Sequence, residues 1–193
     1  MKEAGFSLME LLVVAGLIAT TGAMALPPLL VAIDDNRTAG AAQYMATRLQ
    51  QTRMKALSRS THVALRFSQV GNAYSYTEYV DGNGDGVRSQ DITQGVDRQL
   101  GATERLPDQF IGVDFGLLPG LPSVDPGGPA PGADPIKLGS SNLLSFSAAG
   151  TSSSGSLYIR GRASSQYVVR VFGDTARIRV LKFNGRARRW LPV

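Results

Sequence analysis

The chain has 193 residues, of which 20 are basic and 15 are acidic, and 43% are hydrophobic. This length and composition allow one globular domain of ordinary size with a packed core. The absence of cysteine excludes disulfide bonds and thiolate chemistry, and the single histidine, without partners of catalytic or metal-binding type, favours a structural role. We expect no enzymatic activity and no resident cofactor, with calcium as the one open question considered below.

The first element predicted along the chain is a membrane-spanning helix. No charged residue occurs between Leu11 and Ile33, a run of 23 positions. A helix of that length is about 34 Å long, which exceeds the hydrocarbon core of about 30 Å. We therefore predict a transmembrane segment over residues 6–33.

The same helix is predicted to continue to residue 59. Few helix breakers follow residue 33, and an apolar-leaning stripe at helical spacing predicts packing on a sheet. Pro27 and Pro28 each remove an amide donor and predict a bend within the helix. The stripe consists of Met45, Leu49, Thr52 and Ala56. The basic residues that lie off this stripe are expected to be solvated (Arg48, Arg53, Lys55 and Arg59).

The start of the chain differs from an ordinary secretory signal, in which a small-residue cleavage site follows the apolar core. Here Gly5 precedes the apolar run, so a cut after Gly5 would leave the whole helix on the mature protein with Phe6 first. Glu10 is costly beside a spanning segment and indicates a functional partner, although it could instead reach back to the lipid headgroups. Such a cut after Gly5 would define residues 1–5 as a leader peptide.

Beyond residue 60 the hydrophobic period changes to two, which predicts strands. The first two are expected at 62–67 and 73–80, joined by a turn, and more at 96–106 and 110–115. A segment rich in proline and glycine, 116–142, is predicted to be a long and mobile surface loop. Strands then resume, which predicts an α+β fold: a long N-terminal helix packed on an antiparallel β-sheet or β-sandwich domain over residues 60–193. These last strands are expected at 143–147, 157–160, 167–172 and 176–183.

The loop after the second strand has the first half of a calcium-binding pattern, with oxygen-bearing side chains at alternate positions and a glycine for the turn. The second half departs from that pattern, which requires an acidic ligand at the twelfth position of the loop, where this chain has Ile92. The candidate calcium ligands are Asp81, Asn83, Asp85 and Asp91. The alternative is a hairpin tip in which Asn, Asp and Gly serve turn geometry alone.

The C-terminal end is strongly basic. From Arg160 onward there are nine basic residues and one acidic residue, which indicates a polyanionic partner or a solvated basic face. Asn184-Gly185 predicts a two-residue hairpin turn that would place Phe183 opposite Arg186. One face of that ribbon would then expose arginines and aromatic rings suited to phosphates and bases. The candidate DNA-binding residues are Arg177, Arg179, Arg186, Arg188 and Trp190.

The leader, with Lys2, Gly5, Phe6 and Glu10, resembles the processing and N-methylation motif of type IV pilins and type II secretion pseudopilins. The later landmarks, including Gly155 to Tyr158, are similar to the GspH/FimT family of minor pseudopilins. The resemblance implies cleavage after Gly5 by prepilin peptidase, methylation of Phe6 and assembly with other pilins or pseudopilins. Glu10 would meet the amine of a neighbouring subunit, and Pro27 would loosen the helix in a filament.

The resemblance also implies a location: a single-pass inner-membrane protein with its C-terminal domain in the periplasm, incorporated into a pilus or pseudopilus. The expected function is therefore that of a minor subunit in protein secretion or in a type IV pilus. Members of the FimT type bind DNA for natural transformation through a Gly-Arg-x-Arg motif. Two segments here compete for that role, Ala176 to Arg179 and Gly185 to Arg188, so DNA uptake is the alternative function. The third possible function is that of a plain membrane anchor for an exported domain.

Overall fold

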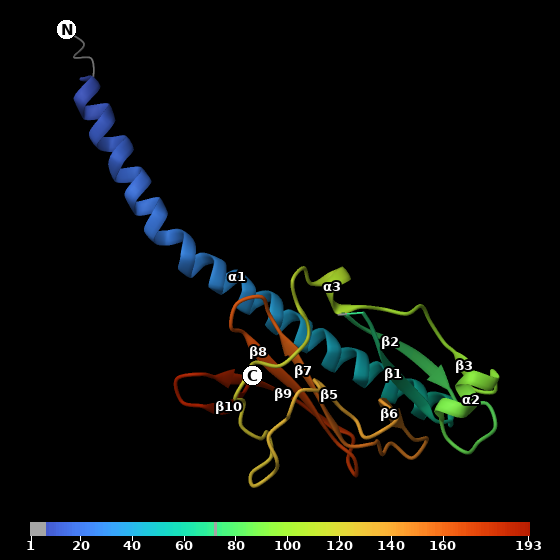
Figure 1. Cartoon of the computed structure of the whole chain (residues 1–193). Helices are drawn as coiled ribbons and strands as arrows, with labels where there is room; N and C mark the ends of the chain where they lie inside the picture. The colour runs from blue at the N-terminus through green and yellow to red at the C-terminus, as the bar shows by residue number, and fades with distance from the viewer. Residues whose placement is uncertain (1–6, 72) are drawn as a thin grey trace.

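The computed structural model describes residues 7–71 and 73–193. Its longest element is helix α1, from Leu8 to Arg59, whose first half extends away from the rest of the molecule (Figure 1). The Ser7 hydroxyl accepts a hydrogen bond from the Met9 amide and caps the start of the helix. Ser60, in the left-handed conformation, ends it. Both prolines lie inside the helix, which bends gently without breaking (Figure 1).

Two antiparallel sheets follow. The first has the strand order β3-β2-β1-β6, and the second has the order β10-β9-β8-β7-β4, with β5 also paired to β7. The first sheet consists of β1 (Val63–Val70), β2 (Ala73–Val80), β3 (Arg98–Gln99) and β6 (Leu143–Phe146). The second consists of β4 (Asp114–Phe115), β5 (Ile136–Lys137), β7 (Gly155–Arg160), β8 (Gln166–Phe172), β9 (Arg177–Asn184) and β10 (Arg189–Pro192). The α+β fold predicted from the sequence is confirmed.

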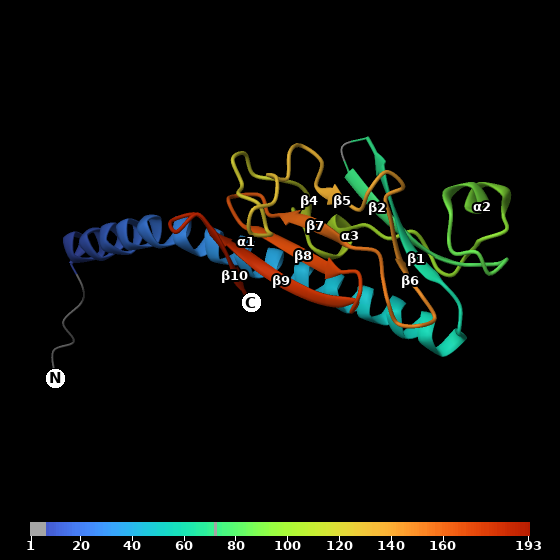
Figure 2. The same ribbon diagram turned by 90° about the horizontal axis from the view of Figure 1, so that it is seen from below.

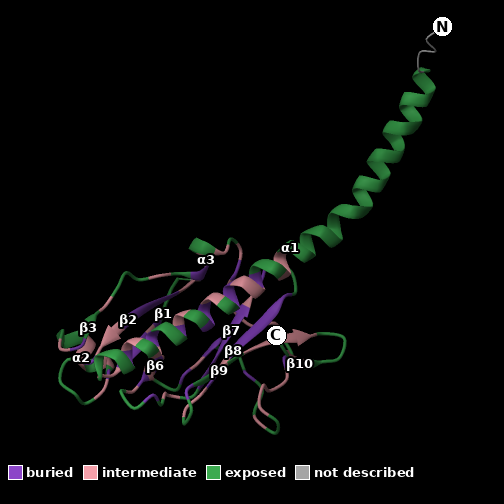
Figure 3. Ribbon diagram, turned by 180° about the vertical axis from the view of Figure 1, so that it is seen from behind, coloured by how far each residue is buried: buried purple, intermediate pink, exposed green. Residues whose placement is uncertain are grey.

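The second half of α1 packs against both sheets and forms the main core with them (Figures 2 and 3). The predicted stripe is buried in full, because its spacing keeps these side chains on one side of the helix. Alanines in the same stripe let the helix approach the strands closely. The buried helix residues are Thr38, Ala41, Ala42, Met45, Ala46, Leu49, Thr52 and Ala56.

Two of the predicted strands are wrong in extent. The segment 96–106 runs beside β2 but pairs with it only at Arg98–Gln99 and at Glu104. It ends in a short helix, α3 (Leu106–Gln109), because Pro107 suits the first turn of a helix. Similarly, Gly112 adopts a positive φ of 83° and turns the chain, which leaves only Asp114–Phe115 as β4.

The predicted C-terminal turn is wrong in its register. In the structure Asn184 pairs with Arg189 and Phe183 pairs with Trp190, so residues 185–188 form a four-residue loop. The Asn184 side chain accepts a hydrogen bond from the Ala187 amide, and Arg188 takes the left-handed φ of 46°. The Asn side chain and the left-handed arginine therefore close a longer loop than the Asn-Gly pair alone suggests.

The segment 116–142 is not a free loop. Its first part, residues 116–135, lies along the outer face of the second sheet, and we call it the strap. Apolar strap residues pack on side chains that point away from the α1 side of β7, β8 and β9, which explains why β7 is buried on both faces. This cluster contains Leu117, Leu118, Leu121, Val124, Tyr158, Val168, Leu181, Phe183 and Trp190.

Candidate functional site

The most exposed apolar surface of the molecule is the first half of α1. Every residue from Leu8 to Ile33 is exposed, and we call this segment the apolar arm (Figure 3). Within the described residues, one helix is long and apolar enough to cross a membrane, and it is this one. A continuous apolar surface of this extent is unfavourable in water, so the arm requires a lipid or protein environment.

The candidate assembly residues lie along this arm. Glu10 is in the first turn of α1, where the partial positive charge of the helix N-terminus favours a carboxylate. Within residues 7–71 and 73–193 it forms no ion pair. Pro27 and Pro28 deprive the carbonyls of the preceding turn of their usual donors. Gly5 and Phe6, the predicted cleavage and methylation residues, lie outside the described residues.

A polar joint fastens α1 to the β domain where the arm ends. Asp34 accepts hydrogen bonds from the backbone amides of Arg162 and Ala163, at 2.8 and 3.1 Å. A side chain at Gly161 would overlap the Asp34 carboxylate, so this close approach requires glycine. The tight turn between β7 and β8 is therefore held directly on the helix. Sequence reasoning missed this joint, since Asp34 and Gly161 are far apart in the chain.

The adjacent residue extends the joint to β8 and β9. Asp35 accepts from the Tyr167 hydroxyl at 3.1 Å and from Lys182 Nζ at 2.6 Å. The hydrogen bond to Asp35 raises the pKa of Lys182 above its usual value. The two aspartates thus fix the position of β7, β8 and β9 relative to the end of the arm.

Further along α1, two basic residues that were expected to be solvated form ion pairs instead. Arg48 Nη2 donates to Glu104 at 2.6 Å, and the Tyr44 hydroxyl donates to the same carboxylate. Lys55 pairs with Glu78, whose side chain is only 2% exposed. The prediction failed because the acidic partners come from β2 and from the segment after β3. The spacing of residues along a helix does not indicate which strands lie beside it.

The Asp81 loop is closed by its own carboxylates. Asp81 accepts hydrogen bonds from the amides of Asn83, Gly84 and Gly86, and His62 Nδ1 lies 3.3 Å from it. Burial alone would raise the pKa of Asp81, but these amide hydrogen bonds outweigh it and hold the pKa below the usual value. The Asp81 carboxylate thus holds the loop closed through backbone amides.

A second loop carboxylate was missed by sequence reasoning. Asp97 is 2% exposed and accepts from the amides of Gly82 and Arg88, which ties the two ends of the loop together. After Arg88 the chain forms a short helix, α2 (Ser89–Gln94), which contains Asp91. Among the described residues, no group of three or more acidic, histidine or cysteine side chains is placed to hold a metal ion. The calcium site stays a prediction.

The basic C-terminal end does not form the single exposed face that was predicted. Trp190 is half-buried in the strap cluster, and its Nε1 donates to the Pro122 carbonyl at 3.1 Å. Phe183 packs beside it, so both rings are only partly accessible for stacking on bases. The four candidate arginines are all exposed, but they lie at opposite ends of β9: Arg177 and Arg179 at its start, and Arg186 and Arg188 beyond its end.

The strap is held near its middle by an ion pair. Arg170 Nη2 donates to Asp125 at 2.6 Å, and the Arg170 guanidinium also lies over the Phe172 ring. At its near end, the Gln166 side chain is buried, accepts from the Leu118 amide and donates to the Gly116 carbonyl. These contacts hold the strap on the sheet, whereas its proline and glycine content predicted a mobile loop.

The sequence model of one family, described as type II transport protein GspH, matches residues 41–175. Among solved structures, the minor pseudopilin EpsH from the type 2 secretion system of Vibrio cholerae is similar, with 14% identity and a TM-score of 0.46. That similarity covers 76% of this chain and 97% of EpsH. No curated protein sequence matches the chain. The family match excludes the apolar arm and the β9–β10 hairpin.

Proposed function

The chain belongs to the type II transport protein GspH family, and we propose that it is a minor pseudopilin, cleaved by prepilin peptidase and assembled through its N-terminal helix. The observation that carries this proposal is the apolar arm: residues 8–33 are exposed along their whole length, while the same helix continues into the core of the β domain. Such a helix can exchange lipid for the helices of neighbouring subunits without any change in the domain.

The N-terminal motif supports the assembly route independently of the family match, which begins at residue 41. Cleavage after Gly5 would create a free amine at Phe6, four residues before Glu10. A carboxylate without an ion pair in the first turn of an apolar helix gains most from a cationic partner in the same low-dielectric layer. The amine of an adjacent subunit is that partner in the proposed filament, and other pseudopilins supply it.

Mass spectrometry of the mature N-terminus tests the processing step. The expected result is a chain that begins with methylated Phe6 when it is produced together with a prepilin peptidase, and an uncut chain without the enzyme. An uncut chain in the presence of an active peptidase would favour the third function, a plain membrane anchor for an exported domain. The proposed orientation places the β domain in the periplasm, which protease accessibility in spheroplasts would check.

The residue Glu10 is the test of assembly. Glu10→Gln removes the charge but keeps the size, so membrane insertion should persist while incorporation into filaments with the other pseudopilins falls at least about tenfold, as expected for loss of one desolvated ion pair. Crosslinking of membrane-embedded subunits measures this incorporation. Normal incorporation of the variant would contradict the role of Glu10.

DNA binding for natural transformation is the second candidate function, favoured by the exposed arginines at both ends of β9. It predicts salt-sensitive binding of duplex DNA that is weakened by Arg186→Ala together with Arg188→Ala. Absence of DNA binding at low salt would remove this candidate. Because Trp190 and Phe183 are half-buried against the strap, such binding would depend more on phosphate contacts than on base stacking.

A further inference from the structure

The β9–β10 loop begins across a groove from the end of the apolar arm. In Figure 1 the hairpin projects from the β domain on the side from which the arm extends, apart from the helix, and in Figure 2 it overlaps the helix. A groove of about 470 Å³ separates it from the helix. The groove is lined by Pro28, Val31 and Ala32 from the arm and by Lys182, Phe183 and Gly185 from the hairpin.

This position fixes the tip relative to a membrane. The charge-free run that ends at Ile33 is about 4 Å longer than a hydrocarbon core of about 30 Å. Val31 to Ile33 therefore lie at the boundary between the acyl chains and the headgroups. Because Gly185 shares a groove with Pro28 and Val31, the loop after it is at headgroup level when the arm spans a bilayer.

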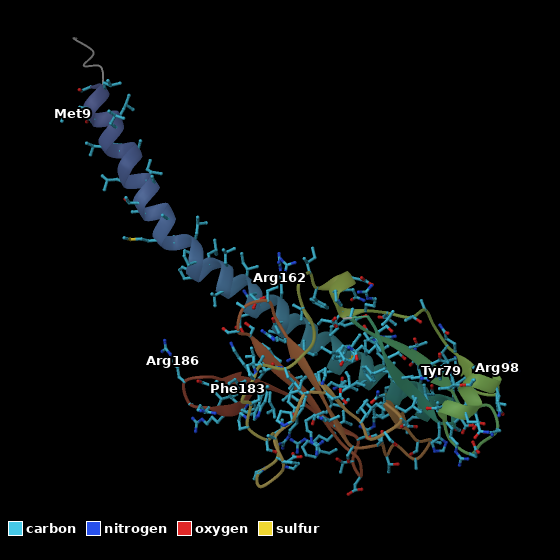
Figure 4. All side chains as sticks on the ribbon, viewed as in Figure 1. Met9, Tyr79, Arg98, Arg162, Phe183 and Arg186 are labelled. Atoms are coloured by element: carbon cyan, nitrogen blue, oxygen red, sulfur yellow. The ribbon has the colours of Figure 1, made fainter. Side chains whose placement is uncertain are left out.

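The tip carries three exposed arginines, Arg186, Arg188 and Arg189. None of them forms an ion pair with any residue in 7–71 or 73–193. In Figure 4, Arg186 lies at the end of the hairpin, on the side of the domain from which the arm extends. Arg188 Nη2 makes one long contact, 3.4 Å to the Gly120 carbonyl, which leaves its charge uncompensated.

The acidic residues nearest this end of the domain do not compensate the arginines. Asp34 is engaged by two backbone amides and Asp35 by Lys182 and Tyr167. The positive charge of the tip is thus directed at the layer where phosphate groups of lipids are found. Basic residues beside a membrane span favour contact with anionic lipids about fivefold each.

We propose that the hairpin tip, residues 185–189, binds the anionic phospholipid headgroups of the leaflet next to the end of the arm. The arginines then fix the depth and orientation of the β domain on the membrane before the subunit leaves it for a filament. This inference rests on the proposed membrane anchoring of the arm. It also gives the Gly185 to Arg188 segment a role that needs no nucleic acid.

The single tryptophan of the chain, Trp190, stands next to the tip and provides the probe. The full chain is reconstituted in bilayers that contain either phosphatidylglycerol or phosphatidylcholine labelled with the same dansyl group on an acyl chain. Energy transfer from Trp190 is expected to be several-fold greater to the labelled phosphatidylglycerol at low salt. High salt should reduce that preference.

The variant Arg186→Gln/Arg188→Asn removes two charges, and asparagine suits the left-handed backbone at position 188. We expect it to abolish most of the several-fold preference for the anionic lipid, since each arginine contributes about fivefold. Arg177→Gln/Arg179→Gln is the matched control. It removes the same charge from the other end of β9, about 23 Å away by strand length, and should leave the preference unchanged.

Equal transfer to both labelled lipids, or an unchanged preference in the tip variant, would overturn the proposal. So would a tip variant that loses DNA binding while it retains the lipid preference. Alkaline extraction of the same membranes distinguishes failure of the headgroup contact from failure of membrane anchoring. A chain that stays in the membrane but shows no lipid preference contradicts only the headgroup contact, whereas a chain that is extracted contradicts membrane anchoring as well.

Discussion

At the scale of single residues, buried and half-buried carboxylates organise this protein. Asp81 and Asp97 close a loop by accepting backbone amides, Asp34 holds the β7–β8 turn on the helix, and Glu104 gathers Arg48 and Tyr44. In each case an anion lies where several donors converge, which offsets the cost of its burial. Each of these residues thus determines the geometry of the loop, turn or side-chain cluster around it, although it contributes little of the buried surface.

Asp81 gives a prediction about acid stability. The pKa of its carboxyl in the folded chain is below the model-peptide value of 3.8, so its stabilising contribution is present above that pH and is lost as the pH falls through the folded value. Asp81→Asn should lower the free energy of unfolding by about 1 to 3 kcal/mol at neutral pH. It should also reduce the loss of stability in acid. Thermal unfolding of the full chain in detergent, from neutral to acidic pH, measures both effects.

Asp85→Asn is the control for this measurement, because the Asp85–Arg88 pair is exposed and contributes little. The same samples test the calcium hypothesis. Millimolar calcium should raise the melting temperature of the native chain and not that of Asp81→Asn if Asp81, Asn83, Asp85 and Asp91 hold the ion. A calorimetric titration without binding at millimolar calcium would remove the metal site.

At the scale of elements, the strap and the β9–β10 hairpin stabilise each other. The strap covers the outer face of β7, β8 and β9, and Trp190 of β10 closes the cluster through its ring and its hydrogen bond to Pro122. The hairpin would otherwise be an edge ribbon with exposed aromatic rings, a surface prone to association. Packing against the strap half-buries those rings, whereas the arginines at the hairpin tip stay exposed.

The strap should open when this contact is lost. Trp190→Ala removes the half-buried ring and the hydrogen bond, and it should lower the free energy of local opening by about 2 kcal/mol, which is roughly 30-fold faster amide exchange in residues 117–125. Hydrogen exchange followed by mass spectrometry measures this. Arg189→Ala, at an exposed neighbouring position, should leave exchange in the strap unchanged, and equal exchange in both variants would refute the coupling.

At the scale of the whole molecule, one helix serves two environments. Its first half is exposed and apolar, and its second half is the central element of the β-domain core, joined to both sheets. The polar joint at Asp34 and Asp35 lies where these two environments meet. A subunit built in this way can transfer its arm between lipid and filament while its domain keeps a fixed relation to the helix.

The core half of α1 should therefore control folding of the whole β domain. Leu49 is fully buried between the sheets, and Leu49→Ala should lower the free energy of unfolding by about 2 to 5 kcal/mol. Met54, 62% exposed on the same helix, provides the comparison, since Met54→Ala should change it by less than about 0.5 kcal/mol. Chemical denaturation in detergent, followed by circular dichroism, checks the difference. Similar effects of the two substitutions would contradict the assigned packing.

The sequence by itself determined the features that depend on neighbouring residues. The charge-free run before Asp34 defines the arm, the stripe through Met45 and Leu49 defines the packed face of the helix, and alternating residues define the long strands, because hydrophobic periodicity is a local property. The leader motif around Gly5 and Phe6 was likewise recognised from the sequence. Its role is tested by mass spectrometry of the mature N-terminus.

Only the tertiary structure decided which distant groups meet. Asp35 and Lys182 are 147 positions apart, and Trp190 meets a carbonyl 68 positions earlier. No local pattern encodes such pairs, so the ion pair of Arg48 with Glu104 was not predicted. The register of the last hairpin was predicted wrongly for a local reason, the hydrogen bond to the Asn184 side chain and the left-handed Arg188. The strap, like the Arg48 ion pair, depends on distant residues: proline and glycine exclude regular structure, but whether such a segment is mobile depends on the apolar face that the sheet offers it.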